Sequence, residues 1–168
     1  MTSVSPDPSE RGSRLVDPRG LRFAAWLTTG VLAAALATRS AWLLGAQTAV
    51  FASGALLGLR FAPYGYLFRT LIRPRLAPPG ELEDQAPPRF AQAVGLAFAL
   101  VGTIAFATGL VGLGLVATGF ALVAAVLNAA FGLCLGCEMY LLIARSRARV
   151  RGTAATSPIS TEKEEVAA

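Results

Sequence analysis

The chain has 168 residues, of which 54% are hydrophobic and only 15% are charged, with a mean hydropathy of +0.57 and a net charge of +5. So little charge excludes an ordinary soluble domain, which needs a polar coat over its whole surface. The absence of histidine excludes His-based acid–base catalysis, His-containing triads and the usual His-containing zinc sites. The charged residues lie in blocks separated by apolar runs of about twenty residues, which predicts an α-helical membrane protein with several spans.

The arginines flank the apolar runs instead of forming a patch on a soluble fold. In that position they set the topology and contact anionic headgroups, so the positive charge does not indicate nucleic-acid binding. The chain has fourteen arginines and one lysine, with abundant Ala and Gly. This composition is typical of a bacterium with a GC-rich genome.

The two ends of the chain are polar. Residues 1–20 contain three prolines, and residues 152–168 are rich in Ser, Thr and Glu, so we expect a disordered cytosolic tail at each end. Residues 21–147 are expected to form the membrane domain. Residues 35–37 also fit a signal-peptidase site. The long tail before the first apolar run and the second run directly after it favour keeping that run as a span.

The apolar runs predict four membrane spans, at residues 22–38, 41–59, 90–109 and 113–144. Arginines gather before the first span, in the 60–89 loop and after the last span, whereas the two remaining turns contain only Arg39. The positive-inside rule therefore predicts that both termini and the 60–89 loop are cytoplasmic. We expect a multi-pass protein of the plasma membrane.

The 60–89 loop is predicted to contain a short amphipathic helix. Residues 61–75 combine bulky apolar side chains with three arginines, which suits a helix lying in the headgroup plane of an anionic leaflet. Pro74 and Pro78 are expected to end this helix. The acidic turn at residues 81–84 that follows is either a solvated connector or a docking surface for a soluble partner.

The last apolar segment is too long for one straight span. As a single α-helix, residues 113–144 would run for about 48 Å, whereas the hydrocarbon core is about 30 Å thick. The helix must therefore tilt and protrude, or it must break. Asn128, Gly132 and Gly136 are the positions at which a break is expected.

This segment contains the only two cysteines, Cys134 and Cys137, and the only acidic residue within an apolar run, Glu138. In a continuous helix the three share one face, in the cytoplasmic half of the membrane. A Cys-x-x-Cys pair cycles between dithiol and disulfide or holds a soft metal. A break at Gly132 would put Cys134 at a helix N-terminus, which stabilises a thiolate. Glu138 would then accept the thiol proton or repel the thiolate.

Three roles are open for this stretch, and they leave open whether the protein is an enzyme. The leading hypothesis is thiol–disulfide or sulfur-transfer chemistry with Cys134 and Cys137 as the redox pair. The second is transport or soft-metal handling, with Glu138, Asn128 and Gln47 lining a polar path. The third is a structural subunit whose cysteines only pack. No nicotinamide or flavin motif and no defined metal site can be read from the chain, so no cofactor is predicted.

Four pieces of the chain, with their residues as they stand, carry a family resemblance. They read Val-Asp-Pro-Arg-Gly-Leu-Arg-Phe at 16–23, Pro-Tyr…Phe-Arg…Arg-Pro-Arg at 63–75, Pro-Pro-Arg-Phe-Ala-Gln at 87–92 and Phe-Gly-Leu-Cys-Leu-Gly-Cys-Glu-Met-Tyr at 131–140. The chain thereby resembles the domain of unknown function 4395 family of small bacterial membrane proteins, over residues 16–147. The resemblance implies several membrane spans but no catalytic role, because the family has no established activity.

The expected partners are the lipid bilayer and a soluble thiol protein. The resemblance implies that the soluble partner is thioredoxin-like or rhodanese-like. Self-association into a homo-oligomer is left open by the sequence.

Overall fold

The structure, a computed structural model, describes residues 15–78 and 82–154 and confirms the all-α class. The predicted tails fall outside these residues, except for 15–20 and 152–154. The main elements are β1 (Leu15–Val16), α2 (Pro18–Thr38), α3 (Ala41–Ala52), α4 (Pro63–Leu67), β2 (Glu83–Asp84), α5 (Ala86–Ala107), α6 (Val111–Val126) and α7 (Leu135–Ala154). The short helical turns are η1 (Ser53–Leu57), η2 (Leu59–Phe61), η3 (Phe68–Ile72), η4 (Arg73–Arg75) and η5 (Leu127–Phe131).

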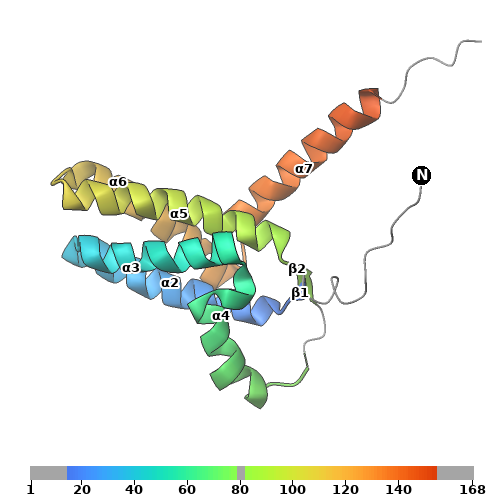
Figure 1. Ribbon diagram of the computed structural model, residues 1–168, viewed down its shortest axis with the longest axis horizontal. Coiled ribbons are helices and arrows are strands. Elements are labelled where there is room, and N and C mark those ends of the chain that lie inside the picture. Colours follow the sequence, from blue (N-terminus) through green and yellow to red (C-terminus); the bar gives the residue numbers. More distant parts are fainter. Residues whose placement is uncertain (1–14, 79–81, 155–168) are drawn as a thin grey trace, which may run out of the picture.

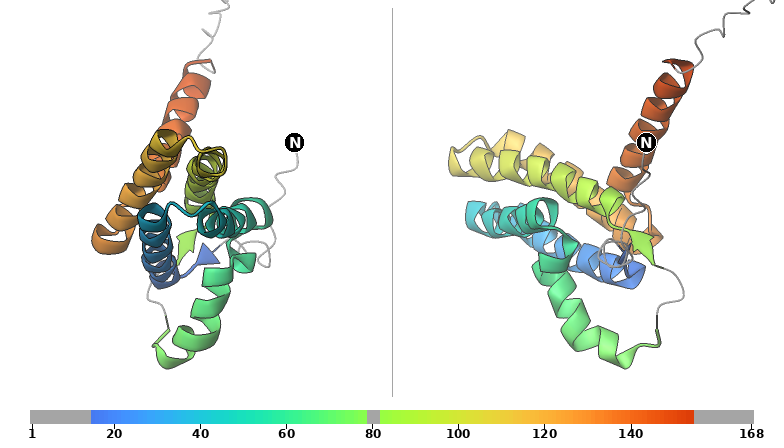
Figure 2. Two further views of the ribbon diagram at one scale, coloured as in Figure 1. Left: turned by 90° about the vertical axis from the view of Figure 1, so that its left-hand side faces the viewer. Right: turned by 45° about the vertical axis from the view of Figure 1, so that its right-hand side comes forward.

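Helices α2, α3, α5 and α6 form a four-helix bundle (Figure 1). In end-on view α3 packs on α2 and α5, and α6 packs on α5 and α2, which closes the ring (Figure 2, left). The centre is small and apolar, with Leu32, Leu44, Phe51 and Ala99 among its buried residues. Because these side chains point inward, each helix is left with an apolar outer face.

Glycines on α5 allow the neighbouring helices to approach closely. A Cβ on Gly95 would lie 2.9 Å from the ring of Phe51. A Cβ on Gly102 would lie 2.8 Å from Leu44 and 2.8 Å from the hydroxyl of Thr118. Small residues of this kind are typical of helix contacts in membranes, where van der Waals packing drives association.

Among the described residues, three helices are long and apolar enough to cross a membrane: Pro18–Thr38, Ala86–Ala107 and Val111–Phe131. This supports a multi-pass membrane protein. The predicted second span is shorter than expected, because the helix of Ala41–Leu57 ends where Gly58 takes a φ of 98°. Its length is about 26 Å, slightly less than the hydrocarbon core. A count of four spans is therefore not established.

Two helices begin earlier than expected because an aspartate precedes each of them. The side chain of Asp17 accepts a hydrogen bond from the backbone N–H of Arg19 at 3.0 Å, so α2 begins at Pro18 and residues 15–20 belong to β1 and α2, not to a disordered tail. The side chain of Asp84 accepts from the N–H of Ala86 at 2.7 Å, so α5 begins before residue 90.

The short antiparallel ladder of β1 and β2 joins these two helix starts. It pairs Leu15 with Asp84 and Val16 with Glu83. The ladder therefore holds the N-terminal ends of α2 and α5 at the same end of the bundle (Figure 1). Two acidic residues of the predicted turn, Glu83 and Asp84, therefore belong to this ladder.

The segment from η2 to η4 is helical, as predicted for residues 61–75, and it projects from the bundle (Figure 2, right). Its position relative to a membrane surface stays a prediction. Gln47, which the transport hypothesis assigned to a polar path, is 1% exposed and accepts at 2.7 Å from the hydroxyl of Tyr64 on α4. Its amide also contacts the Thr28 hydroxyl on α2 at 3.5 Å. Gln47 therefore connects the projecting segment to the bundle.

The predicted span at residues 113–144 is not one helix. The helix of α6 and η5 ends at Phe131, and α7 begins at Leu135 and leaves the bundle in a different direction (Figure 1). A segment of this length was expected either to tilt and protrude or to break, and the chain breaks. The depth predicted for the cysteines assumed one continuous helix, so it does not apply. They lie instead beside the first turns of α5.

Candidate functional site

Cys134 and Cys137 form a disulfide at the N-terminus of α7. Their Cα atoms are 5.2 Å apart. Cys134 precedes the helix and caps it: its sulfur accepts from the backbone N–H of Cys137 at 3.3 Å, and its carbonyl accepts from the N–H of Glu138 at 3.0 Å. The helix N-terminus predicted for Cys134 is therefore present.

The break that creates this terminus depends on Gly132. Its φ of 71° lies in the left-handed region, which glycine enters without a Cβ penalty. Its N–H donates to the carbonyl of Asn128 at 3.1 Å, and the N–H of Leu133 donates to that of Leu127 at 3.2 Å. These bonds close the end of η5 and redirect the chain.

A second glycine holds the new helix against α5. A Cβ on Gly136 would lie 2.5 Å from the Cα of Ala91 and 2.6 Å from its Cβ, so only glycine permits this approach. The rings of Phe90 and Tyr140 meet one turn further on, at 5.9 Å between centroids. Ala91 lies about 7 Å from the start of α5, which puts the cysteine pair near that end of the bundle.

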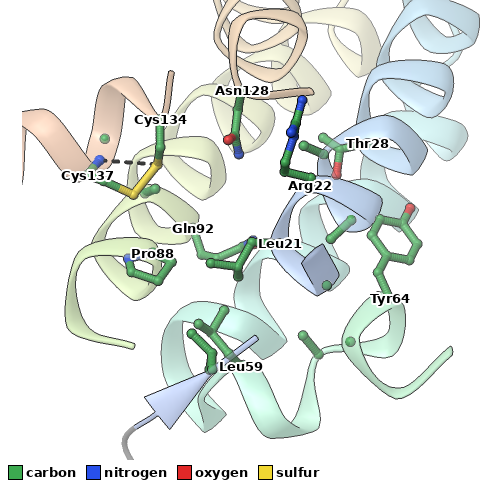
Figure 3. Close-up of a pocket in the computed structure, with 18 of the residues that line it drawn as sticks. Leu21, Arg22, Thr28, Leu59, Tyr64, Pro88, Gln92, Asn128, Cys134 and Cys137 are labelled. Atoms are coloured by element: carbon green, nitrogen blue, oxygen red, sulfur yellow. Dashed lines mark hydrogen bonds between the residues drawn. A yellow bond between two sulfur atoms is a disulfide. The ribbon is translucent and has the colours of Figure 1, made fainter. Parts of the chain in front are cut away.

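The disulfide forms part of the wall of a cavity of about 690 Å³ between α2, α5, α6 and the start of α7. Both cysteines are half-buried. Figure 3 shows them facing the same space as Arg22, Gln92 and Asn128. The Oε1 atom of Gln92 is buried and has no hydrogen-bond partner among the described residues. The site therefore combines a disulfide, a cation and two side-chain amides in a largely apolar cavity.

Tyr64 also lines the cavity, and its hydroxyl donates a hydrogen bond to the side chain of Gln47. Burial raises the pKa of Tyr64 above its ordinary value of 10.0, so it stays a protonated donor at neutral pH. This bond fixes α4 beside the cavity.

The model of a protein family described as Domain of unknown function (DUF4395) matches residues 16–145. The chain belongs to the DUF4395 family. A search of curated proteins and a search of solved structures each found no match. The family match therefore confirms the resemblance predicted from the sequence and assigns no activity.

In this DUF4395 protein, the four pieces that carry the resemblance meet around one cavity. Arg22, Phe68, Gln92 and Cys134 come from the four pieces in turn, and all four residues line the cavity. Segments more than a hundred residues apart in the chain are thus brought to one end of the bundle.

The structure brings together only some of the predicted site residues. Glu138 is exposed and does not line the cavity, because Cys134 lies before the helix and not on a shared helical face. Of the residues expected to form a polar path, Asn128 lines the cavity, Gln47 is buried between helices, and Glu138 lies outside. In residues 15–78 and 82–154 no group of three acidic, Cys or His side chains is arranged to hold a metal.

Two residues of the site were not predicted. Arg22 was interpreted only as a flanking charge that sets topology. Gln92 was given no role, although an amide in an apolar span is a signal of its own, since a polar group there needs a partner. That signal was applied to Gln47 and not to Gln92.

Proposed function

We propose that the protein is a membrane component of thiol–disulfide or sulfur-transfer chemistry, with Cys134 and Cys137 as its redox pair. One observation carries this proposal: the two cysteines are bonded across the first turn of α7, on the wall of a cavity. Two cysteines that only pack need neither a helix N-terminus nor a cavity beside them.

The helix terminus gives the two sulfurs different roles. When a partner thiolate attacks the sulfur of Cys137, the S–S bond breaks and Cys134 leaves as a thiolate. The backbone N–H of Cys137 and the dipole of α7 stabilise that anion, which makes Cys134 the better leaving group. The partner is then joined to Cys137 by a mixed disulfide. A second thiolate of the partner attacks the partner's sulfur in this mixed disulfide and releases Cys137 as a thiolate. The partner dithiol becomes a disulfide, and the two cysteines become thiols.

Glu138 handles the proton in this scheme. It is exposed on the first turn of α7, outside the cavity. It takes the proton of the attacking thiol and returns it to a released thiolate. Its exposed position suits proton exchange with a partner or with water.

The partner is a soluble thiol protein, thioredoxin-like or rhodanese-like, which approaches from the cytoplasm. The N-terminal end of α2, the helical segment 59–75 and α7 lie at one end of the bundle (Figure 1), and most of the arginines belong to these segments. The turns at the opposite end contain only Arg39. This asymmetry supports a cytoplasmic location for the cysteine end of a plasma-membrane protein with both termini inside.

Thiol labelling in intact membranes tests the proposal. The chain has no other cysteine, so every label reports on this pair. We expect both cysteines to be unlabelled under mild oxidant and both to be labelled after a dithiol reductant, in folded protein. In Cys134→Ser the single remaining thiol should be labelled under both conditions. Thiols that stay fully reduced under oxidant, or a disulfide that no dithiol reduces without unfolding, would reject the proposal.

A further inference from the structure

We propose that the cavity beside Cys134 and Cys137 binds a lipid-soluble quinone, which accepts the two electrons of the reduced cysteine pair. This inference rests on the proposed redox function and names the second substrate of that site. It follows from the chemistry of the lining, from the way the cavity reaches the outer face of the bundle, and from the electron balance of the pair.

The lining suits a flat apolar molecule. Phe68 lies under the start of α2, where its ring is 5.9 Å from that of Phe23. Phe98 and Phe120 line the cavity from α5 and α6, with 6.0 Å between their rings. The volume lies within the range of about 300–1,000 Å³ found for pockets that enclose small organic ligands.

The same two rings connect the cavity to the outside of the bundle. Phe98 is 38% exposed and Phe120 is 62% exposed, although both also line the cavity. They belong to the two most apolar of the helices long enough to cross a membrane. A molecule dissolved in the bilayer can therefore contact the cavity lining at these two rings, while its tail remains among the lipids.

The polar groups of the cavity match the two ends of a quinone. A quinone has two carbonyl oxygens that accept hydrogen bonds, and its reduced form has two hydroxyls that donate them. The guanidinium of Arg22 and the amide of Asn128 supply donors. The side-chain carbonyl of Asn128 supplies an acceptor for a quinol hydroxyl.

The reaction balances without another reactant. The two thiols of Cys134 and Cys137 lose two electrons and two protons as the S–S bond forms. The quinone gains the same two electrons and two protons, and its two carbonyl oxygens become hydroxyls. A phospholipid tail would also fit an apolar cavity, but it accepts no electrons and therefore could not reoxidise the pair after a partner has reduced it.

The test uses purified full-length protein in phosphatidylcholine nanodiscs, reduced with a dithiol, freed of reductant and kept anaerobic. Short-tailed ubiquinone and menaquinone are added separately. We expect one quinol to form for each disulfide formed, as measured by the quinone absorbance and by mass spectrometry of the alkylated thiols. In the double variant Cys134→Ser, Cys137→Ser, binding of the quinone should persist while its reduction is lost.

Two matched variants tie the reaction to the cavity. Ala124→Phe on α6 places a ring in the cavity, whereas Ala97→Phe on α5 places the same ring on the exposed face outside the lining. We expect Ala124→Phe to lower the rate of quinol formation by about tenfold or more, since a ring that fills the site removes over 1.4 kcal/mol of binding. Ala97→Phe should leave the rate unchanged. The far-ultraviolet circular dichroism of each variant should match that of the parent protein, which shows that each is folded.

The outcomes separate the two proposals. Active exchange with dithiols, but no binding and no reduction of either quinone, would overturn the quinone inference alone. A phospholipid that copurifies in the cavity and that excess quinone does not displace would overturn it as well. Cysteines inert to dithiols and to quinones would overturn the proposed function and this inference together.

Discussion

Replacing Gly132 with alanine tests whether the break between η5 and α7 creates the cysteine site. No atom lies within 4 Å of a Cβ added at Gly132, so the substitution changes only the preference of the backbone. Its φ of 71° costs an L-residue about 1–2 kcal/mol. The lower entropy of alanine in the unfolded chain offsets part of this cost, but the strain of the left-handed φ outweighs it. We expect Gly132→Ala to destabilise the native structure by about 1–2 kcal/mol.

Gly119→Ala is the matched control. Gly119 lies in the middle of α6, and no atom lies within 4 Å of its added Cβ either. There the backbone is helical, so the same substitution should stabilise the protein by about 0.5–1 kcal/mol. The two variants should therefore differ by about 2 kcal/mol, which is roughly a thirtyfold difference in the unfolding equilibrium constant.

The assay is reversible unfolding in mixed micelles by titration with a denaturing detergent, followed by circular dichroism. A second readout is the labelling rate of the reduced cysteines, which should fall in Gly132→Ala as the cap formed by Cys134 is lost. If alanine stabilises the protein equally at both positions, the chain is helical through residue 132. The argument for a helix terminus at Cys134 would then be refuted.

Three further predictions concern the packing and chemistry of the same end of the bundle. Gly136→Val should displace α7 from the backbone of α5 and destabilise the protein by about 1–3 kcal/mol or more in the same titration. Tyr64→Phe should cost about 1–3 kcal/mol because it leaves the buried Oε1 of Gln47 unpaired. It should also reduce the loss of stability above pH 10.0, since the raised pKa of Tyr64 lets the unfolded chain release its proton first. In single variants, the thiol of Cys134 in Cys137→Ser should be labelled faster at neutral pH than that of Cys137 in Cys134→Ser, because it caps α7.

Controls for two of these predictions lie nearby. Gly30→Ala on α2 has open space around the added Cβ and should stabilise slightly, in contrast to Gly136→Val. Tyr66→Phe alters an exposed ring of the same helix as Tyr64 and should leave both the stability and its pH dependence unchanged. Equal labelling rates for the two cysteines would contradict the role given to the N-terminus of α7.

The sequence anticipated the site in part. Cys134 and Cys137 were selected because they are the only cysteines, and Gly132 was selected because a helix of that length must tilt or break. Glu138 was grouped with them on the assumption of one continuous helix, and the break moves it to an exposed position outside the cavity. The amide of Gln92 in an apolar span was a signal that it needs a partner, but the local sequence does not show which segments its side chain faces.

By itself the sequence determined the helical membrane class, the family and the approximate helices, because hydropathy, length and glycine content are local properties of the chain. Helix starts depended on hydrogen bonds from the first backbone N–H groups to the side chains of Asp17 and Asp84, and two helices begin four residues earlier than predicted. Only the tertiary structure decided that four distant segments line one cavity, and that the disulfide shares it with Arg22, Gln92 and Asn128. The rotation of each helix and the close contacts at Gly95, Gly102 and Gly136 determine which side chains meet at the cavity. Such contacts join residues far apart in the chain, so no local sequence pattern predicts them.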